Sequence, residues 1–187
     1  MGTAFTAVSD DIGFLESNPA ASAVQKYSGL TFIHHSWIAD SAIESLLFTT
    51  RANDFGFGVS GKFLYLPFTA YDVWGTREGK GVISESVATV NVSYNLFKSF
   101  EFYGLALGVN LKAAYRHIPE NIYAGQSAFT AMMDFGSLTR FNLFKPYVSK
   151  DKNFSLGIAL KNLGFDALGE PLPLLLTAGF AYSFVRP

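Results

Sequence analysis

The protein has 187 residues, which fits one domain or part of a larger one, and 14 basic against 15 acidic side chains leave a net charge of −1. This balance gives no basis for nucleic acid as a partner. The chain has no cysteine, which excludes disulfides and thiolate metal sites, and no run of about 18 apolar residues predicts a transmembrane helix. The mean hydropathy of +0.23 and an aromatic content of 16% are compatible with a β-barrel and with a β-sandwich.

Residues 1–28 form the first predicted segment, which is small, polar and rich in alanine. Pro19 bends the chain after Asn18, so we expect a turn and one or two short helical turns here, not a strand. Asp10, Asp11 and Glu16 could bind a cation, but capping and turn contacts explain such residues more simply.

Alternation with a period of two predicts about eight antiparallel strands in the rest of the chain. In residues 103–117, the odd positions from Tyr103 to Tyr115 are apolar or aromatic, and the even positions are small or polar. Short turns are expected at 51–54 and 97–100, and a long glycine-containing loop at 68–83. The alternation is also clear in 54–65, 87–97, 153–163 and 174–184, and it is weaker in 29–38, 41–51 and 126–141.

The face opposite the large residues distinguishes two kinds of sheet. A soluble sheet would carry many charged side chains on this face, whereas here it consists mainly of glycine, alanine, serine and asparagine. In a transmembrane barrel, large residues face lipid and small or polar residues face the lumen. The pattern therefore favours an all-β fold, an antiparallel transmembrane β-barrel. Its predicted lumen-facing polar residues are Lys62, Asn110, Lys112, Arg116 and Lys161.

Eight strands enclose an interior just wide enough for their own side chains, yet the inward positions here are small. We therefore expect a partial barrel whose first strand (29–38) and last strand (173–185) lack a partner. The sequence "TAGFAYSF" at 177–184 points the other way, because it has the pattern of a terminal barrel-assembly signal.

The small-residue wall also predicts that Asn18-Pro19-Ala20 packs on the lumen side. Replacement of Gly108 or Gly157 by serine is expected to have only a mild effect on the protein.

The N-terminal run "GTAFTAVSDDIGFLESNPAASA" resembles the start of FadL-type outer-membrane proteins, the long-chain fatty acid transporters and their PorV-like relatives. The residues that carry this resemblance are Asp10, Asp11, Asn18, Pro19 and Ala20. Nearly the whole chain resembles a spirochaete (Treponema-type) branch, the uncharacterised family UPF0164, through "DFGFGVSGKFLYLPFTAYDVWG", "NLKAAYRHIPE", "AGQSAFTAMMDFG" and "KDKNFSLGIALKNLG". The resemblance implies a plug or hatch at 1–28 inside a barrel wall at 29–187, which is expected to be truncated relative to the family.

The same resemblance implies an outer-membrane location, contact with membrane lipid, and passive uptake of long-chain fatty acids or other hydrophobic, detergent-like compounds. The alternative is a non-transporting barrel that acts as a surface antigen or assembly platform. The lumen cations could attract a fatty-acid carboxylate, or they could pair with acids such as Asp134 and with plug carbonyls. The oligomeric state stays open.

Enzyme chemistry is not predicted. The adjacent His34 and His35 point to opposite faces of a strand, so they cannot chelate one metal ion together there. The sequence contains no G-x-S-x-G, H-E-x-x-H or P-loop motif, and spacing identifies no activated serine beside a histidine. We therefore expect no catalytic residue, metal or cofactor.

Overall fold

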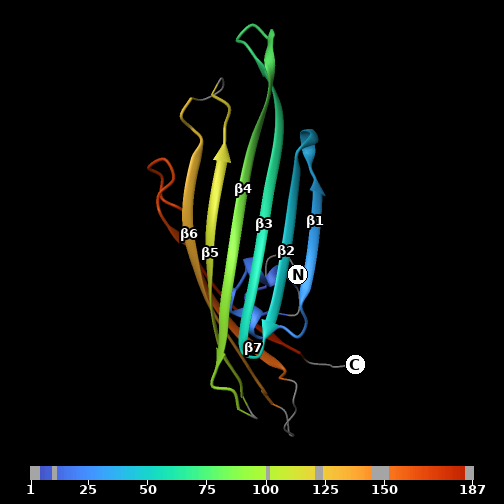
Figure 1. Ribbon diagram of the computed structural model, residues 1–187, viewed down its shortest axis with the longest axis vertical. Coiled ribbons are helices and arrows are strands. Elements are labelled where there is room, and N and C mark those ends of the chain that lie inside the picture. Colours follow the sequence, from blue (N-terminus) through green and yellow to red (C-terminus); the bar gives the residue numbers. More distant parts are fainter. Residues whose placement is uncertain (1–4, 10–11, 100–101, 121–123, 145–151, 184–187) are drawn as a thin grey trace.

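The computed structural model describes residues 5–9, 12–99, 102–120, 124–144 and 152–183. These residues form one antiparallel sheet of eight long strands, in which each strand pairs with the next in chain order (Figure 1). The all-β prediction is confirmed.

All eight predicted strands are present. Three short 3₁₀ helices accompany them: η1 (Ile12–Glu16) and η2 (Pro19–Ala23) in the N-terminal segment, and η3 (Ile38–Asp40) between the first two strands. The short helical turns predicted before residue 28 are thus confirmed. The strands are β1 (Gly29–Ser36), β2 (Ala42–Ala52), β3 (Phe55–Tyr71), β4 (Arg77–Leu96), β5 (Phe102–His117), β6 (Ala128–Phe141), β7 (Phe154–Gly164) and β8 (Leu175–Tyr182). Among the described residues, no helix has the length and apolar character needed to cross a membrane.

The loop predicted at 68–83 is wrong. β3 and β4 continue through this region as a hairpin that extends beyond its neighbours (Figure 1). Its turn is held by Asp72, whose Oδ1 accepts hydrogen bonds from the backbone N–H groups of Trp74 (2.8 Å) and Thr76 (2.7 Å). Gly75 adopts a φ of +81°, which glycine takes without steric cost. A tight turn therefore replaces the expected long loop.

The two faces of the sheet differ as the alternation predicts. Large apolar side chains on the outer face keep much of their surface exposed, as at Leu107 (43%), Ile158 (45%) and Val92 (47%). Their neighbours on the inner face are buried, for example Asn91 and Asn110. The prediction that Leu107, Ile158 and Val92 lie outside the packed interior is confirmed.

The N-terminal segment fills the inner face in the lower half of the sheet (Figure 1). Its side chains supply most of the buried apolar cluster, which includes Phe14, Leu15 and Val24 together with Leu138 of β6. The chain therefore builds its core between this segment and the small residues of the strands, and not within the sheet alone. The predicted packing side of Asn18-Pro19-Ala20 is confirmed.

Glycines let the segment approach the strands. A Cβ on Gly108 would lie 2.3 Å from the backbone carbonyl of Pro19, and one on Gly157 would lie 2.1 Å from the carbonyl oxygen of Thr6. Backbone atoms cannot swing away as a flexible side-chain end can. The expectation that serine at Gly108 or Gly157 would be mild is therefore wrong.

The sheet does not close on itself. Within the described residues, β1 pairs with β2 alone and β8 pairs with β7 alone, so the two outermost strands each have an open edge. The predicted lack of a ladder between the first strand (29–38) and the last strand (173–185) is confirmed as far as residue 183, where the described part of the last strand ends.

Candidate functional site

Asn18 anchors the N-terminal segment to the sheet. Its Oδ1 accepts a hydrogen bond from the backbone N–H of Ala20 (3.1 Å) and so caps η2, with Pro19 in the first helical turn. Its Nδ2 donates to the carbonyl oxygens of Thr6 (2.7 Å) and of Ser137 in β6 (2.9 Å). This fully buried side chain therefore joins two parts of the segment to one strand.

Three buried polar residues form a row across the inner face. Asn91, Asn110 and Asp134 face one another on β4, β5 and β6. Asn91 Nδ2 donates to Asn110 Oδ1 (2.7 Å), and Asn110 Nδ2 donates to Asp134 Oδ2 (3.1 Å). The two asparagines also donate to the carbonyl oxygens of Pro19 (2.9 Å) and Leu15 (3.0 Å). The row thus satisfies carbonyl groups that the packed segment would otherwise bury unpaired.

Asp134 is the charged end of this row. Its carboxylate is fully buried and lies 2.5 Å from Nζ of Lys112, which is 14% exposed. The register of β6 against β7 shifts at this point, and the backbone N–H of Asn162 donates to Asp134 Oδ1 (2.9 Å). A bulge of this kind re-aims a backbone group, here toward the carboxylate. The predicted residues Asn110 and Lys112 therefore meet in one network.

The other predicted inner-face cations have partners as well. Lys62 Nζ of β3 lies 2.6 Å from Glu16 Oε2, and Lys161 Nζ of β7 donates to the Glu16 carbonyl oxygen (3.4 Å). Arg116 Nε lies 2.6 Å from Glu85 Oε1, above the segment. The sequence left open whether these cations attract a fatty-acid carboxylate or pair within the protein. The structure shows them paired with acids and with a carbonyl group of the segment.

The sequence also offered Asp10, Asp11 and Glu16 as a candidate cation site. Asp10 and Asp11 lie outside the described residues. In the part of the chain that is described, no group of three histidine, aspartate or glutamate side chains is placed to hold a metal ion.

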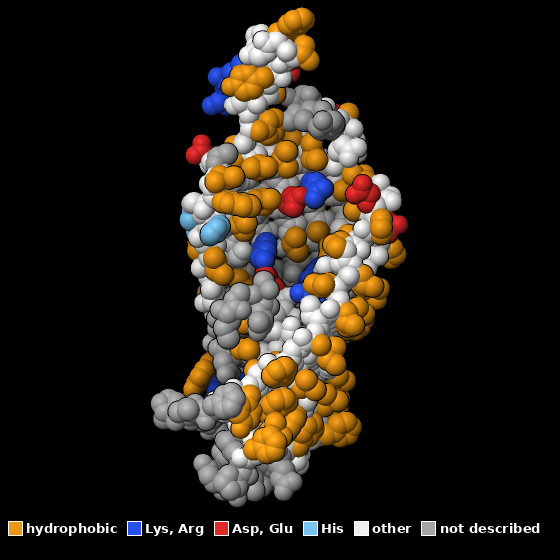
Figure 2. All heavy atoms as spheres, turned by 180° about the vertical axis from the view of Figure 1, so that it is seen from behind, with side chains coloured by type: hydrophobic (Ala, Val, Ile, Leu, Met, Phe, Trp, Pro, Cys, Tyr) orange, Lys and Arg blue, Asp and Glu red, His pale blue; other side chains and the backbone are white. Residues whose placement is uncertain are grey.

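A cavity of about 480 Å³ lies on the inner face above the N-terminal segment, between β4–β6 and the connection from β7 to β8. The Glu85–Arg116 pair forms part of its wall. Figure 2 shows this hollowed face, with hydrophobic side chains gathered in its upper part and charged side chains at mid-height. The apolar lining includes Val87, Ala114, Ala128, Met132, Leu168 and Leu172.

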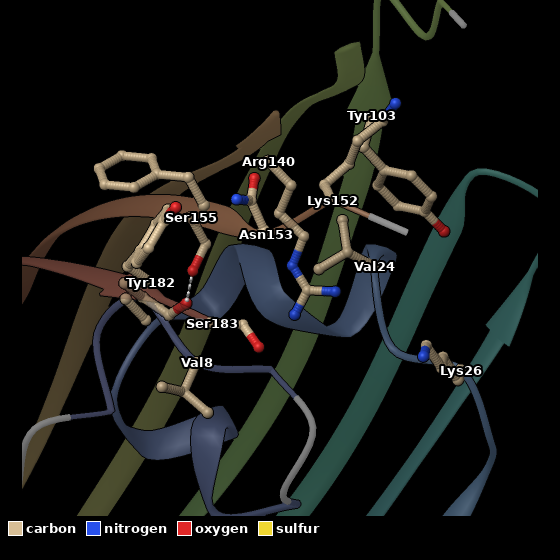
Figure 3. A pocket seen from close by; sticks show the side chains of 13 residues that line it. Val8, Val24, Lys26, Tyr103, Arg140, Lys152, Asn153, Ser155, Tyr182 and Ser183 are labelled. Atoms are coloured by element: carbon tan, nitrogen blue, oxygen red, sulfur yellow. Dashed lines mark hydrogen bonds between the residues drawn. The ribbon is translucent and has the colours of Figure 1, made fainter. Parts of the chain in front are cut away.

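A second cavity, of about 400 Å³, lies at the lower end between the segment and β5–β8 (Figure 3). Arg140 extends into it and donates from Nη2 to Ser9 Oγ. Ser155 Oγ donates to the Ala7 carbonyl oxygen (2.6 Å). Polar and apolar groups contribute about equally to its lining, and the N-terminal segment closes part of it.

One arrangement on the outer face was missed from the sequence. His34 Nδ1 lies 2.5 Å from Glu44 Oε1, and His34 Nε2 lies 2.9 Å from Ser36 Oγ. His34 and Ser36 share a face because they are two residues apart on β1, and Glu44 is the direct cross-strand partner of His34. The i, i+2 spacing was visible in the sequence, but the cross-strand partner required the register.

Known proteins similar to this chain are curated UPF0164 proteins of the spirochaete Treponema pallidum (strain Nichols). One is 29% identical over 199 residues, which cover 97% of this chain and 45% of the relative. Another is 30% identical over 172 residues (85% of this chain, 32% of the relative), and a third is 29% identical over 178 residues (94% and 53%). The chain thus spans between about a third and about half of the length of these relatives. No solved structure matches it significantly.

Residues 1–170 match the family described as "Uncharacterised protein family (UPF0164)". This match includes the N-terminal segment, the row of buried polar residues and the first seven strands. The chain belongs to the UPF0164 family.

Proposed function

We propose that this chain forms part of the wall and the plug of a FadL-like outer-membrane β-barrel, which takes up long-chain fatty acids or other hydrophobic compounds passively. The observation that carries the proposal is the inverted polarity of the sheet. Large apolar side chains cover the outer face, while the inner face holds a buried polar network. Exposure of such a face to water would leave an apolar patch far larger than soluble monomers carry, whereas a bilayer would cover it.

The N-terminal segment is suited to be the plug. Side chains of three strands, Asn91, Asn110 and Ser155, donate hydrogen bonds to it, and the Ser137 carbonyl oxygen of a fourth strand accepts one from Asn18. Such contacts fix the segment within the curvature of the wall and narrow any passage along the inner face. The two open edges of the sheet support a larger barrel, in which further strands would pair with β1 and β8.

The upper cavity is suited to a hydrophobic ligand. Its volume of about 480 Å³ lies within the range of roughly 300–1,000 Å³ that is common for small-molecule sites. Aliphatic side chains form about half of its lining, and Arg116 supplies a cation at its wall. A fatty acid could place its chain against the aliphatic lining and its carboxylate near Arg116, in competition with Glu85.

An uptake assay tests this proposal. The full-length protein is reconstituted into liposomes, and entry of a fluorescent long-chain fatty acid is compared with protein-free liposomes. We expect faster entry with the protein and a further increase after deletion of residues 1–28. Arg116→Gln should weaken uptake, with Lys80→Gln in the β3–β4 hairpin as the control cation. Entry rates equal to those of protein-free liposomes would reject transport.

A second candidate function is a non-transporting outer-membrane barrel that serves as a surface antigen or assembly platform. It is favoured by the pairing of the four predicted inner-face cations with acids or carbonyls, which leaves each of these four engaged before any ligand arrives. The β3–β4 hairpin, which extends beyond the rest of the sheet, would be its exposed element (Figure 1). This candidate predicts no fatty-acid entry above background and strong surface labelling of the hairpin in cells.

A further inference from the structure

The outer face carries a chain of three polar residues at the edge of the sheet: Ser36, His34 and Glu44. In the neutral tautomer with a hydrogen on Nδ1, His34 donates to Glu44 Oε1 (2.5 Å) and accepts from Ser36 Oγ (2.9 Å). This is the order nucleophile, base and carboxylate in which serine hydrolases arrange their catalytic groups. The second oxygen of Glu44 is buried without a partner among the described residues, so His34 is the group that holds this carboxylate.

An apolar groove begins beside this chain of residues. The outer groove has a volume of about 460 Å³ and is lined almost entirely by apolar atoms. Its floor is a row of small residues across three strands, Gly61, Ala88 and Ala113, which face one another in register. Glu44 lines the groove at its β2 end. The other large side chains that border it are Phe32, Leu46, Phe63, Tyr115 and Phe129.

We propose that Ser36, His34 and Glu44 form a serine esterase site that cleaves acyl esters of lipids whose acyl chain lies in the outer groove. Two observations carry the proposal independently: the hydrogen-bonded order of the three side chains, and the apolar groove that Glu44 lines. The lipid substrate rests on the proposed function, because that function places the outer face in a bilayer. The activation of Ser36 by His34 does not depend on the proposed function.

The chemistry is complete with water as the only co-reactant. Ser36 Oγ attacks the ester carbonyl carbon while His34 Nε2 takes its proton, and Glu44 stabilises the resulting imidazolium. The tetrahedral intermediate then breaks its bond to the leaving alcohol, which receives that proton from His34. Water attacks the acyl-serine in the same way, releases the fatty acid and returns a proton to Ser36.

The test uses the full-length protein in mixed micelles of detergent and diacyl phosphatidylcholine, with a fluorophosphonate probe and measurement of released fatty acid. We expect peptide mapping to find the probe on Ser36 and Ser36→Ala to abolish both signals. His34→Gln should slow both by about 10²-fold or more, the usual contribution of a general base. Glu44→Gln should also slow them, because it weakens the support of the imidazolium.

Two control variants keep the test specific. Ser84→Ala removes another serine of the outer face, away from the groove, and His35→Gln removes the neighbouring histidine, which points to the inner face. Both should label and release fatty acid like the natural protein. Folded protein that leaves Ser36 unmodified, or labelling that His34→Gln leaves unchanged, would overturn the proposal. Modification of Ser36 without fatty-acid release would overturn the lipid substrate. A failed uptake assay would reject transport and leave the labelling result intact.

Discussion

Serine at Gly108 should weaken the hold of the sheet on its N-terminal segment. The added Cβ would lie 2.3 Å from Pro19 and 2.5 Å from the backbone nitrogen of Ala20, whereas ordinary contact begins at 3.4 Å. The segment must therefore move by about 1 Å, and this shift would stretch the hydrogen bond from Asn91 to the Pro19 carbonyl. Overpacking of this kind costs roughly 1–3 kcal/mol, and we expect a loss in that range.

The control for this experiment is Gly61→Ser, because a Cβ on Gly61 meets nothing within 4 Å. Both variants are unfolded in urea, and trypsin cleavage after Lys26 reports release of the segment. Gly108→Ser should lower the unfolding midpoint and speed the cleavage, and Gly61→Ser should change neither by much. Equal stability and equal protection of the two variants would refute the close packing of segment and sheet.

Three further changes probe the inner network and the outer face. Asp134→Asn leaves the largely buried ammonium group of Lys112 without its carboxylate, and should cost about 3 kcal/mol in urea unfolding. Lys62→Gln removes an ion pair whose partners are each more than 40% exposed, so its cost should stay below about 1 kcal/mol in the same assay. Leu107→Arg places a cation on the outer face and should cost roughly 2–4 kcal/mol in liposomes if it lies near the bilayer midplane. Val73→Arg in the exposed β3–β4 turn is the matched control and should be close to neutral.

The strands were predictable from the sequence because large apolar residues of one face alternate with small residues of the other, which gives a clear period of two. The packing side of Asn18-Pro19-Ala20 followed from the same alternation, since only the small face leaves space for it. The β3–β4 hairpin was not predicted, because Gly75 and Gly79 in a polar stretch suggested a loop. The Asp72 turn, with glycine three residues later, was the signal that could have corrected it.

The contacts within the site depended on information that one sequence does not contain. The row of Asn91, Asn110 and Asp134 exists only because the registers of three strands align these positions. The pairing of His34 with Glu44 likewise depends on the length of the turn between β1 and β2. The alternation predicts on which face of the sheet a side chain lies, but it does not predict which residue of the neighbouring strand lies opposite.

The central claim is that the outer face of this sheet contacts lipid, and the absence of cysteine makes it directly measurable. Nitroxide labels on Leu107→Cys and Ile158→Cys, in full-length protein reconstituted into liposomes, report collisions with oxygen and with a water-soluble nickel complex. We predict strong relaxation by oxygen and little by nickel at both positions, and the reverse for Val73→Cys in the β3–β4 turn. Strong relaxation by nickel at Leu107→Cys and Ile158→Cys in the folded protein would contradict the account.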